Sequence, residues 1–340
     1  MGSIEACLTD YSTDQRGDVG SWVRIPSMDL LNDVLPRMSK LDAQSGGQHY
    51  LKMASTTNLI AALLKQNVER IDKVRSIAGR VLCELILKAE HLQYPGQDYL
   101  KSHIHQGLQW SSPSDLYPVM VHILKIPEYR LELLTGLISS AGGLTESLVR
   151  HSSSCLIEYM DNLPITAPAD PSLEAIFTTL LDIAVKYVRQ DRVTIPLLDV
   201  LGLLYESGTL TKISNNSLHL KLFTIVRKDT FKCRNVRKLL SSIKVYIGLI
   251  SIDGSPVKSK AIQQMLSYLV HAFPRIRIEA SDQLFTQLSV SEEADEDMDM
   301  MEAIEIITGT DWTEPLPQIK PQRDKLYALL KVPKPVLVKK

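Results

Sequence analysis

The chain has 340 residues, of which 44% are hydrophobic and 23% charged, a balance that is typical of a folded protein rather than a disordered one. Its formal net charge of −1 argues against a general nucleic-acid-binding protein, because such proteins normally carry a strongly positive charge. No apolar run reaches the length of about 18 residues that a membrane-spanning helix requires, so we expect no membrane insertion.

Apolar residues recur at helical spacing along most of the chain, and no strand alternation of useful length is present. Residues 1–90 begin with half of a helix and continue as helical hairpins. Residues 91–113 contain proline and glycine without a periodic apolar pattern, which predicts a long loop. Residues 114–162 predict further hairpins. The helices expected in this half cover residues 18–35, 49–66, 71–90, 114–126 and 127–140, followed by a helix from 142 to 162.

The segment 163–171 carries three prolines and is expected to link two halves of the chain. After it, residues 172–290 predict a second set of helical hairpins. Residues 291–340 differ in composition, because they combine an acidic segment, two terminal helices and a basic tail. The helices expected in this half cover residues 172–190, 193–206, 218–228, 233–250, 256–271, 274–290, 300–308 and 322–330.

A dipeptide of valine or isoleucine followed by arginine recurs near the start of the second helix of several expected hairpins. We expect the aliphatic side chain to pack inward and the arginine to reach a carboxylate or a turn carbonyl of an adjacent repeat. This arrangement is typical of HEAT repeats, so the sequence predicts an all-α fold, a HEAT/armadillo-like α-solenoid of stacked helical hairpins. The dipeptides are Val23-Arg24, Val74-Arg75, Val149-Arg150, Val236-Arg237 and Ile276-Arg277.

Motifs that would mark an active site or a ligand site are missing from the sequence: it has no phosphate-binding loop, nucleophile elbow, zinc-protease motif or calcium loop. His103 and His105 could contribute to a metal site, but nothing nearby completes one. The four cysteines lie far apart in apolar runs, which favours buried thiols in a reducing compartment over disulfides or zinc ligands. We expect no cofactor and no enzymatic activity, with an enzyme that matches no motif as an alternative.

A basic cluster between residues 227 and 244 contains a single acidic residue, Asp229. One interpretation is a solvated face of two helices, which is the usual meaning of such a cluster. The other is a surface that meets an acidic protein partner and speeds the encounter. The acidic residues between 292 and 299 are either a solvated linker or a segment that folds back on this cluster. The candidate protein-binding residues are Arg227, Lys228, Lys232, Arg234, Arg237 and Lys238.

Several stretches of the sequence resemble the C-terminal region of a known family, and the resemblance extends over nearly the whole chain. In residue type and position they are similar to the tubulin-folding cofactor D family, whose members are also called tubulin-specific chaperone D. The stretches are RGDVGSWVR (16–24), ERIDKVRSIAG (69–79), GGLTESLVRHSSSCLIEYM (142–160), GTDWTEPL (309–316) and QRDKLYALLKVPKPVLV (322–338).

The resemblance implies a chaperone in the cytoplasmic pathway that assembles and disassembles the α/β-tubulin heterodimer. It implies that the protein captures β-tubulin and acts with cofactors E and C and with an Arf-like small GTPase. Stimulation of GTP hydrolysis by tubulin would be indirect, through cofactor C. The same resemblance implies a role in organising the microtubule cytoskeleton, with a location in the cytoplasm, at the cytoskeleton and at the centrosome. A generic α-solenoid adaptor of another pathway is the alternative.

The resemblance covers only the last part of the much longer members of the family. Because the ends of a solenoid need caps, we expect an exposed apolar end near Ile4 to Leu8.

Overall fold

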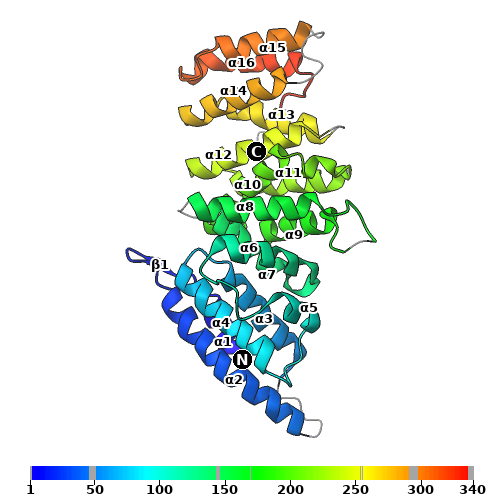
Figure 1. Ribbon diagram of the computed structural model, residues 1–340. Helices are drawn as coiled ribbons and strands as arrows, with labels where there is room; N and C mark the ends of the chain where they lie inside the picture. Colours follow the sequence, from blue (N-terminus) through cyan, green and yellow to red (C-terminus); the bar gives the residue numbers. More distant parts are fainter. Residues whose placement is uncertain are drawn as a thin grey trace. The chain divides into compact units, whose positions relative to one another are not determined.

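The computed structural model describes residues 2–45, 51–142, 146–168, 170–252, 254, 256–290 and 298–335 (Figure 1). Within these residues the chain forms sixteen α-helices and almost no β-structure, so the prediction of an all-α helical fold is confirmed. The chain divides into two compact units, Met1–Ile183 and Ala184–Lys340. The boundary falls inside a helix rather than in the proline-rich segment 163–171 that we expected to separate the two halves.

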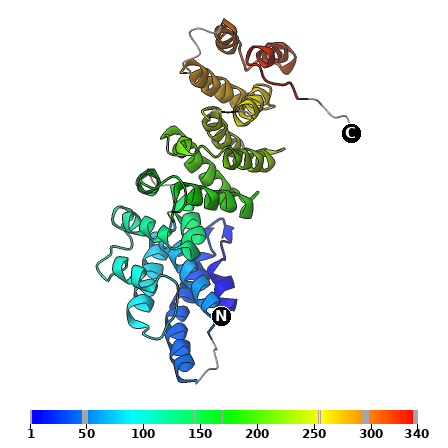
Figure 2. The ribbon, with the colours of Figure 1, turned by 90° about the vertical axis from the view of Figure 1, so that its right-hand side faces the viewer.

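The first unit consists of helical hairpins stacked on one another. Its helices are α1 (Gly2–Leu8), α2 (Ser21–Gln44), α3 (Met53–Asn67), α4 (Asp72–Lys88), α5 (Gln97–His103), α6 (Pro113–His122), α7 (Pro127–Ala141) and α8 (Glu146–Asp161), with a 3₁₀ turn η1 (Ile123–Lys125) after α6. Helix α3 packs against both α4 and α7, and α8 packs against both α6 and α7. The stacking of successive layers within this unit is visible in two views (Figures 1 and 2).

The second unit also consists of stacked helical hairpins. Its helices are α10 (Asp191–Glu206), α11 (Asn216–Thr230), α12 (Val236–Ile250), α13 (Val257–Tyr268), α14 (Pro274–Ser289), α15 (Met298–Gly309) and α16 (Leu316–Leu329), with a 3₁₀ turn η2 (Leu210–Lys212); α9 (Leu173–Lys186) contains the boundary. Helix α12 is central, because it packs against α10, α11, α13 and α14. Helix α15 packs between α14 and α16.

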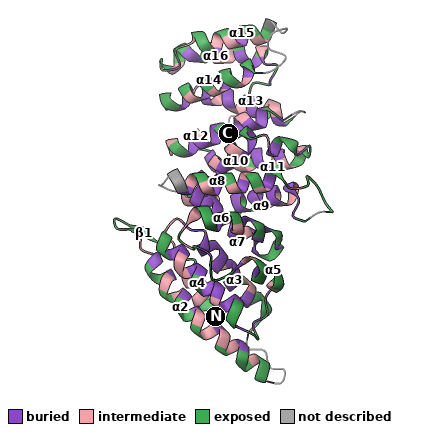
Figure 3. Cartoon of the chain, viewed as in Figure 1, coloured by how far each residue is buried: buried purple, intermediate pink, exposed green. Residues whose placement is uncertain are grey.

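Helix α12 shows how the sequence produces these elements. The side chain of Asn235 accepts a hydrogen bond from the amide of Lys238 and so caps the first turn. Leu239, Ile243 and Tyr246 follow at intervals of three or four residues, and all three are buried. Buried residues lie between the helices of each unit and exposed residues on the outer faces (Figure 3). Apolar burial of this kind stabilises a fold by about 25 cal/mol per Å².

Several local predictions differ from the structure. Helix α2 continues to Gln44 rather than ending at 35. The segment 91–113 is not a plain loop, because it contains helix α5. Helix α16 begins at Leu316 rather than at 322, since Pro317 lies in its first turn, where a missing N–H costs little. A short antiparallel hairpin of β1 (Thr13–Asp14) and β2 (Gly17–Asp18) precedes α2. The expected helix start at 143–145, most of the acidic segment (291–297) and the end of the basic tail (336–340) lie outside the described residues.

The expected exposed apolar end near Ile4 to Leu8 is not observed. Leu8 is only 1% exposed, because α1 packs against α2 and α3. Ile4 is half-buried. The first helix is therefore an integral part of the first unit.

A buried histidine links the two ends of the α10–α11 connection. His219 is 0% exposed, and its Nδ1 lies 2.8 Å from the hydroxyl oxygen of Tyr205. Its Nε2 lies 2.9 Å from the carbonyl oxygen of Ile213. Because a carbonyl can only accept a hydrogen bond, Nε2–H donates to the carbonyl oxygen of Ile213. The Nδ1 atom of the neutral ring then accepts a hydrogen bond from the Tyr205 hydroxyl. Burial lowers the pKa of His219, although the bond to the Ile213 carbonyl partly offsets this effect.

The lowered pKa of His219 predicts a loss of stability in mild acid. The unfolded chain takes up a proton near the ordinary pKa of 6.5, whereas the folded chain does so only at lower pH. The stabilising contribution is therefore complete above that value and declines as the pH falls below it. We expect the urea midpoint to fall between about pH 7 and pH 5, and to fall less steeply in His219→Gln.

Part of the pH dependence is expected to remain in the His219→Gln variant. His271 also has a lowered pKa, caused by burial and by the nearby guanidinium of Arg277. The double variant His219→Gln/His271→Gln should show the smallest slope. An unchanged slope in both variants would show that neither ring is the source of the acid sensitivity.

Candidate functional site

Five of the buried cationic side chains in the described part of the chain lie at turns of the stacked hairpins. They lie in the first turns of α2, α4, α7, α12 and α14, and each donates hydrogen bonds to carbonyl or carboxylate oxygens. Turn carbonyls have no partner within a helix, so a buried cation supplies the hydrogen bonds that water would otherwise make. The five residues, all less than one-tenth exposed, are Arg24, Arg75, Arg130, Lys238 and Arg277.

In the first unit, Arg24 joins three separate segments. Its Nη1 donates to the carbonyl oxygen of Asp10 at 2.6 Å, and its Nη2 lies 2.8 Å from a carboxylate oxygen of Asp18. Its Nε donates to the side-chain oxygen of Gln66 in α3 at 3.0 Å. Arg24 therefore holds the chain around the β1–β2 hairpin against the layer formed by α2 and α3.

Two further buried arginines anchor the long connections of the first unit. Arg75 donates to the carbonyl oxygen of Ser111 at 2.9 Å, which fixes the end of the 91–113 segment against α4. Arg130 donates to the carbonyl oxygen of Leu124 at 2.9 Å and to the carboxylate of Asp170 at 2.7 Å. The second bond holds the proline-rich segment against α7, so this segment packs on the first unit.

In the second unit, Lys238 lies between two carboxylates. Its Nζ is 2.5 Å from Asp229 at the end of α11 and 3.0 Å from Asp191 at the start of α10. Asp229 also accepts the backbone amide of Arg189 at 2.7 Å, and Asp191 accepts the side-chain amide of Asn235 at 2.7 Å. These bonds place the turn before α10 beside the turn before α12.

Arg277 binds four carbonyl oxygens in two separate connections. Its guanidinium donates to the carbonyl oxygens of Trp312 at 2.5 Å, Thr313 at 2.9 Å and Glu314 at 3.2 Å, all in the connection between α15 and α16. It also donates to the carbonyl oxygen of His271 in the turn before α14, at 3.0 Å. Arg277 thus joins the α13–α14 hairpin to the α15–α16 hairpin.

The expected dipeptide rule is correct for some repeats and wrong for others. The arginines of Val74-Arg75 and Ile276-Arg277 are buried behind buried aliphatic side chains, as expected. Arg24 is also buried, but Val23 before it is 38% exposed and does not pack inward. Arg150 and Arg237 are exposed. In α12 the buried cation is Lys238, one residue after the arginine that the pattern indicated.

The predicted protein-binding cluster separates into an exposed group and one buried residue. Lys238 is 2% exposed and bound to two carboxylates, so it is not available to a partner and the prediction is corrected for this residue. The other five residues are exposed around the turn between α11 and α12. We call these five residues the basic turn: Arg227, Lys228, Lys232, Arg234 and Arg237.

Two residues beside the basic turn were not identified from the sequence. Arg189 is exposed in the turn between α9 and α10, and its amide is bound to Asp229. Phe231 is 68% exposed in the basic turn itself. The sequence signal for Phe231 was its position within the basic cluster. Arg189 has no such signal, because it approaches the cluster only through the folding of the chain.

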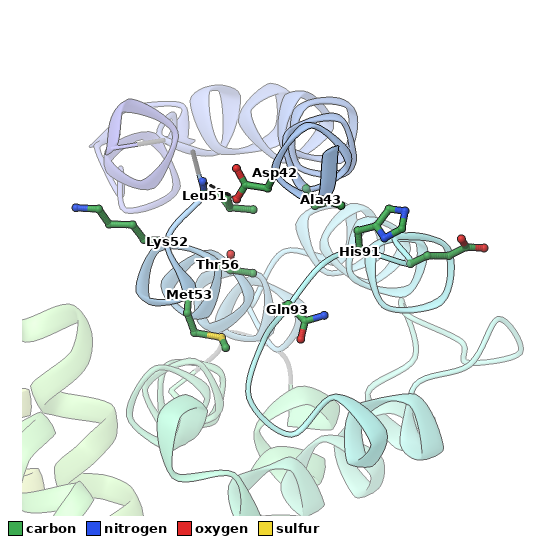
Figure 4. Close-up of a pocket in the computed structure, with 10 residues that line it drawn as sticks. Asp42, Ala43, Leu51, Lys52, Met53, Thr56, His91 and Gln93 are labelled. Carbon is green, nitrogen blue, oxygen red and sulfur yellow. Dashed lines mark hydrogen bonds between the residues drawn. The ribbon is translucent and has the colours of Figure 1, made fainter. Parts of the chain in front are cut away.

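A cavity of about 670 Å³ lies in the first unit and is lined by α2, the start of α3 and the chain after α4 (Figure 4). Within it, Asp42 accepts a hydrogen bond from the backbone amide of Leu51 at 3.0 Å. Asp42 lies on α2, whereas His91 belongs to the chain after α4, on another wall. The bond to Leu51 gives this carboxylate a structural partner.

The two histidines that could contribute to a metal site both have backbone partners. His103 Nδ1 lies 2.9 Å from the carbonyl oxygen of Tyr99, and His105 Nδ1 accepts the amide of Gly107. Among the described residues, no group of three or more histidine, cysteine, aspartate or glutamate side chains could hold a metal ion.

All four cysteines are free thiols, but Cys83 alone among them is buried and the other three are half-buried. Among the residues that the structure describes, no helix combines the length and apolarity needed to cross a bilayer.

Comparison with known proteins agrees with the resemblance seen in the sequence. Residues 57–238 match a family described as "Tubulin folding cofactor D C terminal". The chain is 28% identical to a tubulin-specific chaperone D of Dictyostelium discoideum over 174 residues, which cover 45% of this chain and 12% of that protein. It is 22% identical to a tubulin-folding cofactor D of Schizosaccharomyces pombe over 299 residues, which cover 84% of this chain and 26% of that protein.

The chain thus spans about a quarter or less of the length of the curated relatives that it matches. No solved structure shows a significant match. The matched family region runs from α3 to the first turn of α12 and so includes most of the stacked hairpins and the whole basic turn. Because this region covers more than half of the 340 residues, the chain belongs to the tubulin-folding cofactor D family.

Proposed function

We propose that this chain is a non-enzymatic chaperone of tubulin folding that binds β-tubulin through the basic turn. Its membership of the cofactor D family supports the pathway, and the exposed cations of the basic turn support the site. The cations are presented by a turn that Lys238 and its two aspartates fix in place. An exposed cluster of one sign speeds association with an acidic surface and orients it on arrival.

The same proposal includes the sister components of the pathway. Cofactors E and C and an Arf-like small GTPase would share the stacked hairpins with β-tubulin during assembly and disassembly of the heterodimer. Any effect on GTP hydrolysis would then be indirect, through the partner. We place this activity in the cytoplasm, at the microtubule cytoskeleton and its centrosome. Weak contacts summed over a broad helical surface would supply the affinity without a deep pocket.

Charge reversal in the basic turn is expected to weaken the capture of β-tubulin. The variant Arg234→Glu/Arg237→Glu should bind about tenfold more weakly than the wild type at low salt, and the difference should shrink as salt increases. Both side chains are exposed, so the fold should be retained. The measurement is a binding titration of the 340-residue chain with labelled β-tubulin, repeated with cofactor E and with the small GTPase.

A matched control reverses two exposed lysines elsewhere in the second unit. Lys260 in α13 and Lys320 in α16 are exposed and lie outside the basic turn. The variant Lys260→Glu/Lys320→Glu has the same net charge as the test variant and should bind β-tubulin like the wild type. Equal affinity of all three proteins at low salt would refute the assignment to the basic turn. Absence of binding to all three partners would favour a generic adaptor.

A further inference from the structure

The positive surface around the basic turn includes a second turn, which is distant in the sequence but adjacent in the structure. Asp229 accepts the backbone amide of Arg189 at 2.7 Å, and the side chain of Asn235 donates to Asp191 at 2.7 Å. These two bonds connect the α9–α10 turn to the α11–α12 turn on both sides of Lys238. Arg189 is exposed, so its cation adds to the five of the basic turn.

The acidic residues of the two turns do not neutralise this surface. The side chain of Asp229 is 6% exposed and contacts the ammonium of Lys238 at 2.5 Å. The side chain of Asp191 is 44% exposed and shares the same ammonium at 3.0 Å. The buried lysine offsets one of these two carboxylates, so the three groups together carry a net charge of −1. Arg189 and the five exposed residues of the basic turn outweigh that charge and keep the exposed face positive.

An aromatic ring lies within this positive surface. Phe231 is 68% exposed, although an aromatic ring of this size is normally buried. The ammonium of Lys232 lies 5.4 Å from the centroid of the ring, within the range of a cation–π contact. Lys232 has a φ of 57°, so the backbone next to Phe231 adopts the left-handed conformation. Exposed aromatic and arginine side chains that lie together are typical of the energetically dominant part of a protein interface.

We propose that Arg189, Phe231 and the basic turn bind an acidic polypeptide segment that carries an apolar side chain, with the apolar side chain packed on Phe231. The surrounding cations would pair with the carboxylates of that segment. The inference rests on the proposed function, for which it names the chemistry of the bound partner segment. A nucleic acid would also fit cations around an aromatic ring, but the net charge of −1 opposes it.

The test uses two labelled peptides of about twelve residues, a length that can span neighbouring turns when extended. Both are rich in glutamate, and they differ only at a central position, which is leucine in one and serine in the other. The measurement is fluorescence anisotropy with the 340-residue chain at low salt. A thymidine oligonucleotide of similar length serves as the nucleic-acid probe. Far-UV circular dichroism confirms that each variant is folded.

Three results are expected from this titration. Wild type should bind the leucine peptide more tightly than the serine peptide, and both more tightly than the oligonucleotide. Phe231→Ala should weaken binding of the leucine peptide about fivefold and leave the serine peptide unchanged. Arg189→Asn, which tolerates the φ of 65° at this position, and Arg234→Glu/Arg237→Glu should weaken both peptides, the latter about tenfold.

Other outcomes would overturn the inference. Equal effects of Phe231→Ala on both peptides would remove the role of the ring. Tighter binding of the oligonucleotide would assign the surface to nucleic acid. Stronger peptide binding after glutamine replaces the acidic residues between 292 and 297 would assign the surface to the chain's own acidic segment. Capture of β-tubulin that is weakened by Arg234→Glu/Arg237→Glu but unchanged in Phe231→Ala and Arg189→Asn would leave the proposed function intact and refute this inference alone. Peptide binding without any capture of β-tubulin would refute the proposed function and leave this inference intact.

Discussion

Replacement of Lys238 by methionine is expected to lower the free energy of unfolding of the second unit by about 3–5 kcal/mol. Lys238 is 2% exposed, and its ammonium contacts Asp229 at 2.5 Å and Asp191 at 3.0 Å. Methionine retains most of the side-chain volume but removes the charge. The carboxylate of Asp229, which is 6% exposed, would then remain buried without its compensating cation. Urea unfolding followed by circular dichroism, with hydrogen exchange of α10 to α12, measures the loss.

Two further variants separate the ion pair from the packing of the side chain. Arg237→Met changes the adjacent, exposed cation and should alter stability by less than about 0.5 kcal/mol. Lys238→Met/Asp229→Asn removes the uncompensated charge and should recover part of the lost stability, because an amide is cheaper to bury than a carboxylate. Equal losses in Arg237→Met and Lys238→Met would contradict the role of the buried ammonium.

Replacement of Arg277 by alanine is expected to release the α15–α16 hairpin from α14 at a cost of about 3 kcal/mol or more. The guanidinium donates to the carbonyl oxygens of Trp312, Thr313 and Glu314 and to that of His271. Alanine leaves these carbonyls without the charged donor that they share. Hydrogen exchange should show faster exchange in α15 and α16 than in α10 to α12, and the emission of Trp312 should shift toward that of a solvated ring.

The geometry of the guanidinium can be tested apart from its charge. Arg277→Lys keeps the charge but offers a single ammonium in place of a planar fork, so it should recover only part of the stability. Arg275→Ala changes an exposed arginine two residues earlier in the same helix and should have little effect. Full recovery by lysine would show that charge alone is sufficient and that the forked donors are not needed.

Much of the fold could be predicted from the sequence because helical periodicity is a local property. The stripe of Leu239, Ile243 and Tyr246 is visible without any knowledge of its neighbours. The burial of Lys238 in place of Arg237 could not be predicted in this way. Successive residues of a helix point about 100° apart, so the choice between two adjacent cations depends on where the neighbouring helices lie.

The candidate site shows the same division between local and distant information. The five cations of the basic turn are adjacent in sequence, so their cluster was visible before the fold was known. Arg189 lies about forty residues earlier and joins them only because Asp229 binds its amide. The exposure of Phe231 was equally hidden, since a phenylalanine in a helical protein is expected to be buried.

The buried cations also bear on how far such a sequence can diverge. Arg277 binds the carbonyl oxygens of residues 312–314, and Arg75 binds that of Ser111, so both arginines recognise the main chain of a connecting segment. Every amino acid supplies the same carbonyl. Substitutions in the connecting segments therefore leave these bonds intact, whereas loss of a single arginine removes several at once. Bonds to the main chain can therefore hold such hairpins together even in sequences that share as little as 22% identity.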